Sequence, residues 1–164
     1  MIERCILYVE DDANDVFLLR TAFEDAGIAD PILVVSDGQQ AIDYLRGVGN
    51  YSDRSQYPLP ILVLLDLKLP RQSGLQVLAW IRAQPALKGL VVIMFTSSHQ
   101  PMDLEQAYDL GVNSFIVKPV GLQERLELAQ FFKGWWLRFN MFAPSFGTSM
   151  GSELPRARST SAPE

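Results

Sequence analysis

The 164-residue chain has little cysteine, histidine or positive charge, and each shortage argues against a class of protein. The single cysteine, Cys5, rules out an intramolecular disulfide. The single histidine, His99, rules out a metal site made of several imidazoles, and a Ser-His-Asp hydrolase would depend on it alone. The formal net charge of −5 and the pI of about 4.9 argue against a nucleic-acid-binding protein, because such proteins carry a basic patch or stripe.

Long hydrophobic runs are missing as well. No apolar run reaches the ~18 residues of a membrane span, and the first short apolar run ends in acids rather than in the cleavage site of a secretory leader. We therefore expect a cytoplasmic protein without a membrane or a direct nucleic-acid partner. Hydrophobic residues make up 48% of the chain, which is enough for the core of one domain without a disulfide or a structural metal.

The composition changes near the C-terminal end of the chain. Residues 1–143 have the mixture of apolar and polar residues that a folded domain needs, and we assign them to one domain. From Pro144 the chain is rich in Ser, Pro, Gly and Arg. We expect residues 144–164 to form a disordered tail, because they have little to bury.

Apolar runs alternate with helical patterns along the domain. Five runs predict strands, at residues 6–9, 32–35, 61–65, 90–95 and 114–117. The run from Ile61 to Leu65 has no polar alternation, which is typical of a strand buried on both faces of a parallel sheet. The first helical pattern has Asn14 or Asp15 as its expected N-cap. The alternation predicts an α/β fold with a doubly wound parallel sheet and helices on both faces.

Polar residues follow each predicted strand. They are Glu10 and Asp11, Asp37, Asp66, Thr96 and Lys118. The carboxyl ends of parallel strands lie along one edge of the sheet, where open α/β folds bind ligands. Two carboxylates ~4 Å apart repel by about 4 kcal/mol at an effective dielectric near 20, so they need a cation or a raised carboxyl pKa as in paired-acid catalysis. The lysine and the single central Asp66 favour a Mg²⁺ site, with Mg²⁺ as the expected cofactor.

The same groups suit phosphoryl transfer. The Asp66 carboxylate can act as a nucleophile and carry the phosphoryl group as an aspartyl phosphate. Lys118 and a bound Mg²⁺ would offset the charge on the phosphoryl oxygens. The hydroxyl of Thr96 would donate a hydrogen bond to one of them.

Four motifs at the strand ends carry a resemblance to a known family. They are Val-Glu-Asp-Asp at 9–12, Leu-Asp-Leu-Lys-Leu-Pro-Arg-Gln-Ser-Gly at 65–74, Phe-Thr-Ser at 95–97 and Val-Lys-Pro at 117–119. Over roughly residues 3–140 the chain resembles the receiver domain of the two-component response regulators. The resemblance implies a flavodoxin-like sheet with the strand order 2-1-3-4-5.

The resemblance also implies how the acidic residues are used. Asp66 is the phosphoacceptor, and Glu10, Asp11 and Asp66 hold Mg²⁺ together with the backbone carbonyl of Lys68. Glu10 stands where many receivers have Asp, which lengthens the reach to the metal by one methylene. Lys68 replaces a frequent asparagine, and we expect its charge to alter the lifetime of the phosphoryl group.

The remaining implied roles concern the switch. Thr96 is the switch hydroxyl, and Phe115 occupies the aromatic switch position, where Tyr is more common. Lys118 is the phosphate-pairing lysine. The resemblance implies that its bond to Pro119 is cis, a conformation largely confined to proline.

A narrower resemblance is to the single-domain regulators that accompany bacterial phytochromes. The shared features are a long loop with Tyr51 and Tyr57 before the third strand, the Asp-Leu-Xaa-Leu-Pro run, and tryptophans in the last helix. This resemblance implies a sensor histidine kinase as the partner, with a phytochrome kinase as the candidate.

The last predicted helix begins near Leu122, continues to Trp136 or beyond, and ends in a dense group of aromatic residues. Leu122, Leu126 and Ala129 form its expected inward stripe. The aromatic residues that follow are Phe131, Phe132, Trp135, Trp136 and Phe139. They spread over more than one helical face, and we expect an interface with a second copy of the chain, because aromatic residues are enriched in interface cores. The alternative is that they fold back onto their own domain.

The function we expect is that of a phosphoacceptor signalling protein rather than an enzyme, although it supports its own phosphorylation and dephosphorylation. Without an effector domain, its output would pass through protein contacts, or it would act as a phosphorelay shuttle or phosphate sink. An aspartyl-phosphate phosphatase generally uses a second Asp two residues after the nucleophile, where this chain has Lys68. A flavodoxin-like nucleotide binder would not place Glu10, Asp11 and Asp12 where they repel phosphate.

Overall fold

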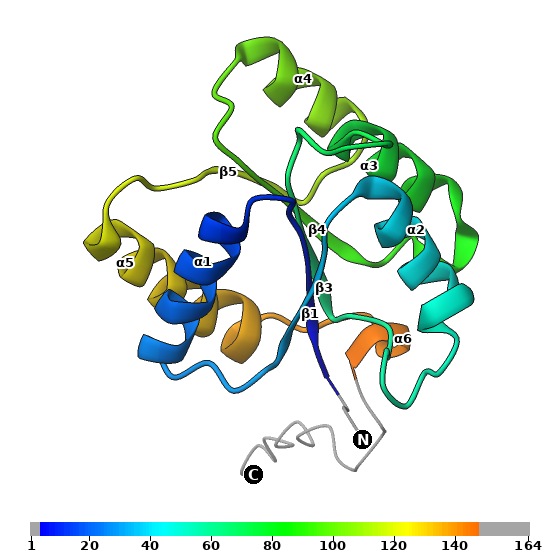
Figure 1. Cartoon of the computed structure of the whole chain (residues 1–164), viewed down its shortest axis with the longest axis horizontal. Helices are drawn as coiled ribbons and strands as arrows, with labels where there is room; N and C mark the ends of the chain where they lie inside the picture. Colours follow the sequence, from blue (N-terminus) through cyan, green and yellow to red (C-terminus); the bar gives the residue numbers. More distant parts are fainter. Residues whose placement is uncertain (1–3, 148–164) are drawn as a thin grey trace, which may run out of the picture.

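The computed structural model describes residues 4–147, which form a three-layer structure with a parallel sheet in the middle (Figure 1). The strands are hydrogen-bonded in the order β2-β1-β3-β4-β5. They are β1 (Ile6–Val9), β2 (Ile32–Val35), β3 (Leu62–Leu65), β4 (Val91–Thr96) and β5 (Ser114–Val117). This arrangement confirms the predicted doubly wound α/β fold and its flavodoxin-like strand order.

Helices cover both faces of the sheet, as right-handed crossovers between parallel strands require. The helices α1 (Ala13–Asp25) and α5 (Leu122–Phe132) lie on one face (Figure 1). The other face carries α2 (Gly38–Arg46), α3 (Gly74–Ala83) and α4 (Pro101–Asp109). Short 3₁₀ turns, η1 (Gly49–Tyr51) and η2 (Pro85–Leu87), lie in two of the loops. Within residues 4–147, no helix has the length and apolar character needed to cross a membrane.

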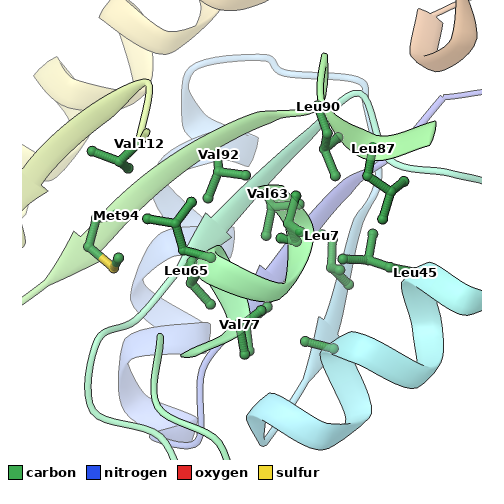
Figure 2. Packing of buried hydrophobic residues seen from close by; sticks show 14 of the residues in the cluster. Leu7, Leu45, Val63, Leu65, Val77, Leu87, Leu90, Val92, Met94 and Val112 are labelled. Carbon is green, nitrogen blue, oxygen red and sulfur yellow. The ribbon is translucent and has the colours of Figure 1, made fainter. Parts of the chain in front are cut away.

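The central strands β1, β3 and β4 are buried on both faces, so alternate side chains enter two separate cores. Leu7, Val63 and Val92 face α2 and α3 in the cluster that Figure 2 shows. Their neighbours Tyr8, Leu64 and Ile93 face α1 and α5. The register pairs Val9 with Leu65 and Leu65 with Met94, so β1 and β3 end level with one another, whereas β4 continues beyond Met94 to Thr96.

The first helix begins in a way that the sequence did not indicate. Asp12, in an extended conformation, is the N-cap of α1, and its Oδ1 accepts hydrogen bonds from the N–H groups of Asn14 (2.7 Å) and Asp15 (3.2 Å). The prediction of Asn14 or Asp15 as the cap was therefore wrong. The earlier cap places Asp15 in the first turn, where helical side chains point back toward the N-terminus and here toward the edge of the sheet.

The long loop between α2 and β3 is held against α2 by one arginine. Arg54 donates hydrogen bonds to the carbonyl oxygens of Tyr44 (2.8 Å), Leu45 (2.8 Å) and Tyr57 (3.1 Å). The rings of Tyr44, Tyr51 and Tyr57 contact one another with centroid separations of 5.2 to 6.0 Å. In the structure the two loop tyrosines thus anchor their own loop.

Beyond α5 the chain continues as a π-helical segment, η3 (Lys133–Phe139), and then crosses beneath the sheet to the short helix α6 (Pro144–Gly147) (Figure 1). Phe142 packs on the core beside α1, whereas Phe146 is buried in the core beside α2 and α3. The predicted boundary at residue 143 is therefore too early, because the apolar ring of Phe146 completes the core of the domain. Residues 148–164, the rest of the predicted tail, lie outside the described residues.

Candidate functional site

The backbone fixes the side chains of the site one residue beyond the strands. The N–H of Glu10 donates to the carbonyl of Val35, that of Asp66 to Val9, and that of Lys118 to Thr96, at 2.8 to 3.1 Å. These bonds continue the parallel ladders past β1, β3 and β5. As predicted, the residues after these strands lie along one edge of the sheet.

The side chain of Lys118 is the centre of the cluster. Its Nζ donates hydrogen bonds to Glu10 Oε2, to Asp15 Oδ2 at 2.8 Å and to Asp66 Oδ2 at 3.0 Å. These acceptors use all three N–H donors of the ammonium group. The centroid of the Phe95 ring lies 6.0 Å from Nζ. Glu10, Asp66 and Lys118 are all buried, so water screens their charges little.

Burial and charge shift the protonation of the cluster in opposing directions. Burial disfavours the charged form of Lys118, but the hydrogen bonds to Asp15 and Glu10 and the charge of Asp66 outweigh it, so the pKa of Lys118 is raised. Burial is also the largest influence on Glu10, and it raises the pKa of that carboxyl despite the hydrogen bond from Lys118. For Asp15, the hydrogen bonds from Lys118 and Arg125 outweigh burial and lower the pKa.

Three carboxylates are close enough to hold a metal ion together. Glu10, Asp11 and Asp66 each offer an oxygen, and these oxygens lie within 4.8 Å of one another. Glu10 and Asp66 are buried and Asp11 is exposed, so the group opens to solvent on one side. Oxygen ligands with room for waters fit Mg²⁺. Lys68 is exposed, and its N–H donates a hydrogen bond to Asp66 Oδ1 at 3.4 Å. The role of its backbone carbonyl as a metal ligand stays a prediction.

The predicted switch residues lie on β4 and β5. Thr96 ends β4, is fully buried, and its Oγ1 accepts a hydrogen bond from the N–H of Ser98 at 3.2 Å. Phe115 is half-buried and packs against the core beside α2 and α3. The predicted cis bond between Lys118 and Pro119 was wrong: this bond is trans, the form that X–Pro bonds favour by ~0.5–1 kcal/mol.

Two residues at the carboxyl edge differ from the sequence analysis. Asp37 follows β2 as predicted, but its Oδ1 caps α2 by accepting from the N–H of Gln40 at 2.8 Å, and it does not belong to the carboxylate group around Lys118. Asp15 was missed as a site residue and contacts Lys118 directly. The sequence feature that could have identified Asp15 is its position in the first turn of the helix that follows the acidic end of β1. The N-cap at Asp12 directs that first turn toward the site.

The aromatic residues at the end of α5 divide between the core and the surface. Phe132 is buried against Phe23, with ring centroids 5.6 Å apart, and Trp136 packs on the same core. The buried Phe132 was therefore wrongly assigned to an interface, whereas the interface role of the half-buried Trp136 stays a prediction. The other three residues form what we call the aromatic surface: Phe131, Trp135 and Phe139, with exposed fractions of 76%, 65% and 69%. They line a groove of about 460 Å³.

The inward stripe of α5 also begins later than predicted. Leu122 is exposed, whereas Arg125 and Ala129 are buried. A spacing of three and four residues leads from Ala129 to Phe132 and Trp136, which places these three residues on one helical face.

Comparisons with known proteins point in one direction. The family model described as the response regulator receiver domain matches residues 6–130. Response regulator Rcp1 from Synechocystis sp. is 34% identical over 134 residues, which cover 82% of this chain and 89% of that protein. The crystal structure of the phosphorylated cyanobacterial phytochrome response regulator RcpA matches with a TM-score of 0.78 at 32% identity, covering 85% of this chain and 98% of its own. The Mn²⁺-bound form of Rcp1 matches with a TM-score of 0.76 at 32% identity, covering 85% and 99%.

Proposed function

The chain belongs to the response regulator receiver family, and from this premise we propose that it is a signalling switch that accepts a phosphoryl group on Asp66 from the phosphohistidine of a sensor histidine kinase. One observation carries the proposal. Lys118 Nζ lies 3.0 Å from Asp66 Oδ2, beside a group of carboxylates that can share a divalent cation. A buried carboxylate with a cation on each side is suited to hold a phosphoryl group.

The proposed reaction forms one bond and breaks one. An oxygen of the Asp66 carboxylate attacks phosphorus, the P–N bond to the donor imidazole breaks, and the imidazole nitrogen keeps the electron pair. Lys118 and the Thr96 hydroxyl donate hydrogen bonds to the phosphoryl oxygens. Mg²⁺ held by Glu10, Asp11 and Asp66, with the Lys68 carbonyl, would supply positive charge opposite those oxygens.

The switch follows from the new charge at Asp66. A phosphoryl oxygen would attract the Thr96 hydroxyl away from the N–H of Ser98, which it now contacts at 3.2 Å. Phe115 on the neighbouring strand is half-buried, and in this proposal it moves between an inward and an outward position. Phosphorylation would bias this equilibrium between two arrangements rather than create a new one.

The test is phosphorylation by acetyl phosphate in the presence of Mg²⁺, followed by intact mass measurement. The wild-type protein should gain one labile phosphoryl group, and Asp66→Asn should gain none. Asp109→Asn is a matched control, because Asp109 is an exposed carboxylate on α4. Equal labelling of the wild type and Asp66→Asn would reject the assignment, and loss of labelling on addition of EDTA is the expected sign of the metal requirement.

We further propose that the donor is a kinase of the phytochrome class. The support is the similarity to RcpA, whose structure is that of a phytochrome response regulator. Incubation with autophosphorylated phytochrome kinase should transfer phosphate to wild type within seconds to minutes. Transfer at a rate no faster than from an unrelated histidine kinase would contradict this partner, while leaving the phosphoacceptor role intact.

The aromatic surface supports a homodimer as the route of output. Phe131, Trp135 and Phe139 recur every four residues along one face of the last helix and its continuation, and a contiguous exposed apolar patch of this kind marks a protein–protein contact. Phe131→Ala/Trp135→Ala should therefore halve the molar mass in light scattering. Phe17→Ala removes an equally exposed aromatic ring from α1 and should leave the dimer intact. A mass that is the same for both variants would reject this interface.

A further inference from the structure

Asp15 lies on α1, outside the acidic group that the sequence predicted, and it holds the same ammonium as that group. Its Oδ2 accepts a hydrogen bond from Lys118 Nζ at 2.8 Å. Its Oδ1 accepts a hydrogen bond from Arg125 Nη2 at 3.3 Å. One carboxylate therefore bridges the lysine that follows β5 and an arginine of α5.

Asp15 differs from the other two acceptors of Lys118 in having no place among the proposed metal ligands. Glu10 and Asp66 each accept a hydrogen bond from the ammonium, and both belong to the group of carboxylates that would hold Mg²⁺. A cation would compete with Lys118 for these two carboxylates. Asp15 is not one of these proposed ligands. It can therefore keep its hydrogen bond with the ammonium when Glu10 and Asp66 bind a cation.

Arg125 provides a second, independent observation. Its side chain is buried, with 9% of the residue exposed, and its Nε and Nη1 have no hydrogen-bond partner among the residues that the structure describes. A buried guanidinium with so few acceptors costs free energy relative to an apolar side chain of similar volume. An apolar side chain could fill the same space between α1 and α5. The charge of Arg125 is needed for a different purpose, which is to orient the carboxylate of Asp15.

We propose that Asp15 is a positioning residue for the phosphoryl-transfer reaction, and that Arg125 holds the Asp15 carboxylate in place. The inference rests on the proposed function of Asp66. Asp15 keeps the ammonium of Lys118 directed at the phosphoacceptor. The contacts from Arg125 through Asp15 to Lys118 thereby connect the phosphorylation site with α5, the helix that leads into the aromatic surface.

A double-mutant cycle of Asp15→Asn and Arg125→Gln tests this chain of contacts, with the initial rate of labelling by acetyl phosphate and Mg²⁺ as the readout. Asp15→Asn should slow labelling about tenfold, the factor expected for one hydrogen bond between charged groups. Arg125→Gln should slow it about threefold in the wild-type background and have no effect in the Asp15→Asn background, because it acts through Asp15. Asp109→Asn should label at the wild-type rate.

Two kinetic outcomes would overturn the inference. An Asp15→Asn rate within about twofold of wild type would remove the positioning role, since one charged hydrogen bond is worth more than that. An equal effect of Arg125→Gln in both backgrounds would show that Arg125 does not act through Asp15. Failure of the wild-type protein to label at all is a different result and would count against the proposed function of Asp66.

A second readout requires neither a phosphoryl donor nor Mg²⁺. The ¹⁵Nζ resonance of Lys118, assigned by its loss in Lys118→Met, reports the hydrogen bonds of the ammonium directly. Asp15→Asn should shift and broaden this resonance, and with Asp15 intact Arg125→Lys should preserve it better than Arg125→Gln. A resonance that is unchanged in Asp15→Asn would refute the positioning role whatever the labelling experiments show.

Discussion

Replacing Lys118 with Met should strongly destabilise the protein, because it removes the ammonium that three carboxylates share. Lys118 donates to Glu10, Asp15 and Asp66, and its side chain is 4% exposed. Three charge-assisted hydrogen bonds of ~1.5–3 kcal/mol each set an upper limit of about 4.5–9 kcal/mol. The ammonium no longer has to be desolvated and a carboxylate can take up a proton, so we expect a loss of about 3–5 kcal/mol, the range for removing one partner of a buried ion pair.

The pH dependence of this loss identifies its electrostatic origin. The pKa of Lys118 is raised above the unfolded value of roughly 10.4, so the stability it contributes is fully present below that pH and constant across neutral pH. The pKa of Glu10 is already raised by burial and should rise further once the lysine is gone. A raised carboxyl pKa favours the folded state at low pH, so the deficit of Lys118→Met should shrink as the pH falls from about 8 to about 5.

Urea unfolding followed by far-UV circular dichroism measures the effect, with EDTA present and at both pH values. Mg²⁺ should restore part of the lost stability, because the divalent cation replaces the missing positive charge and binds the folded state. Lys88→Met is the matched control, since Lys88 is exposed, and should change the stability by less than about 0.5 kcal/mol. A loss at pH 8 below about 1 kcal/mol, or one that is the same at both pH values, would refute this reasoning.

The remaining predictions concern the C-terminal part of the domain. Phe132→Ala should lower the free energy of unfolding by about 3–5 kcal/mol because it empties a buried site, whereas Leu122→Ala, at an exposed position of α5 outside the aromatic surface, should change it by less than about 0.5 kcal/mol; similar losses would show that α5 does not present the face seen here. Phe146→Ala should cost about 3–5 kcal/mol in the same urea assay, and Met141→Ala, a change at an exposed residue, should be neutral; an unaffected midpoint in Phe146→Ala would contradict the packing of α6 on the core.

The sequence by itself determined the layers of the fold and most of the site. Apolar runs without alternation can be buried only when both faces of a parallel sheet are covered, and parallel strands bring their carboxyl ends to one edge. Glu10, Asp66 and Lys118 could therefore be placed together from their positions after three such runs.

The tertiary structure decided the contacts that depend on how elements dock. The stripes Phe131–Trp135–Phe139 and Phe132–Trp136 have the same four-residue spacing, and the docking of α5 against α1 selects the second for the core. The same docking brings Arg125 to Asp15. A helical repeat defines which residues share a face, but the direction of that face is set by packing against elements distant in sequence, and local patterns do not contain that information.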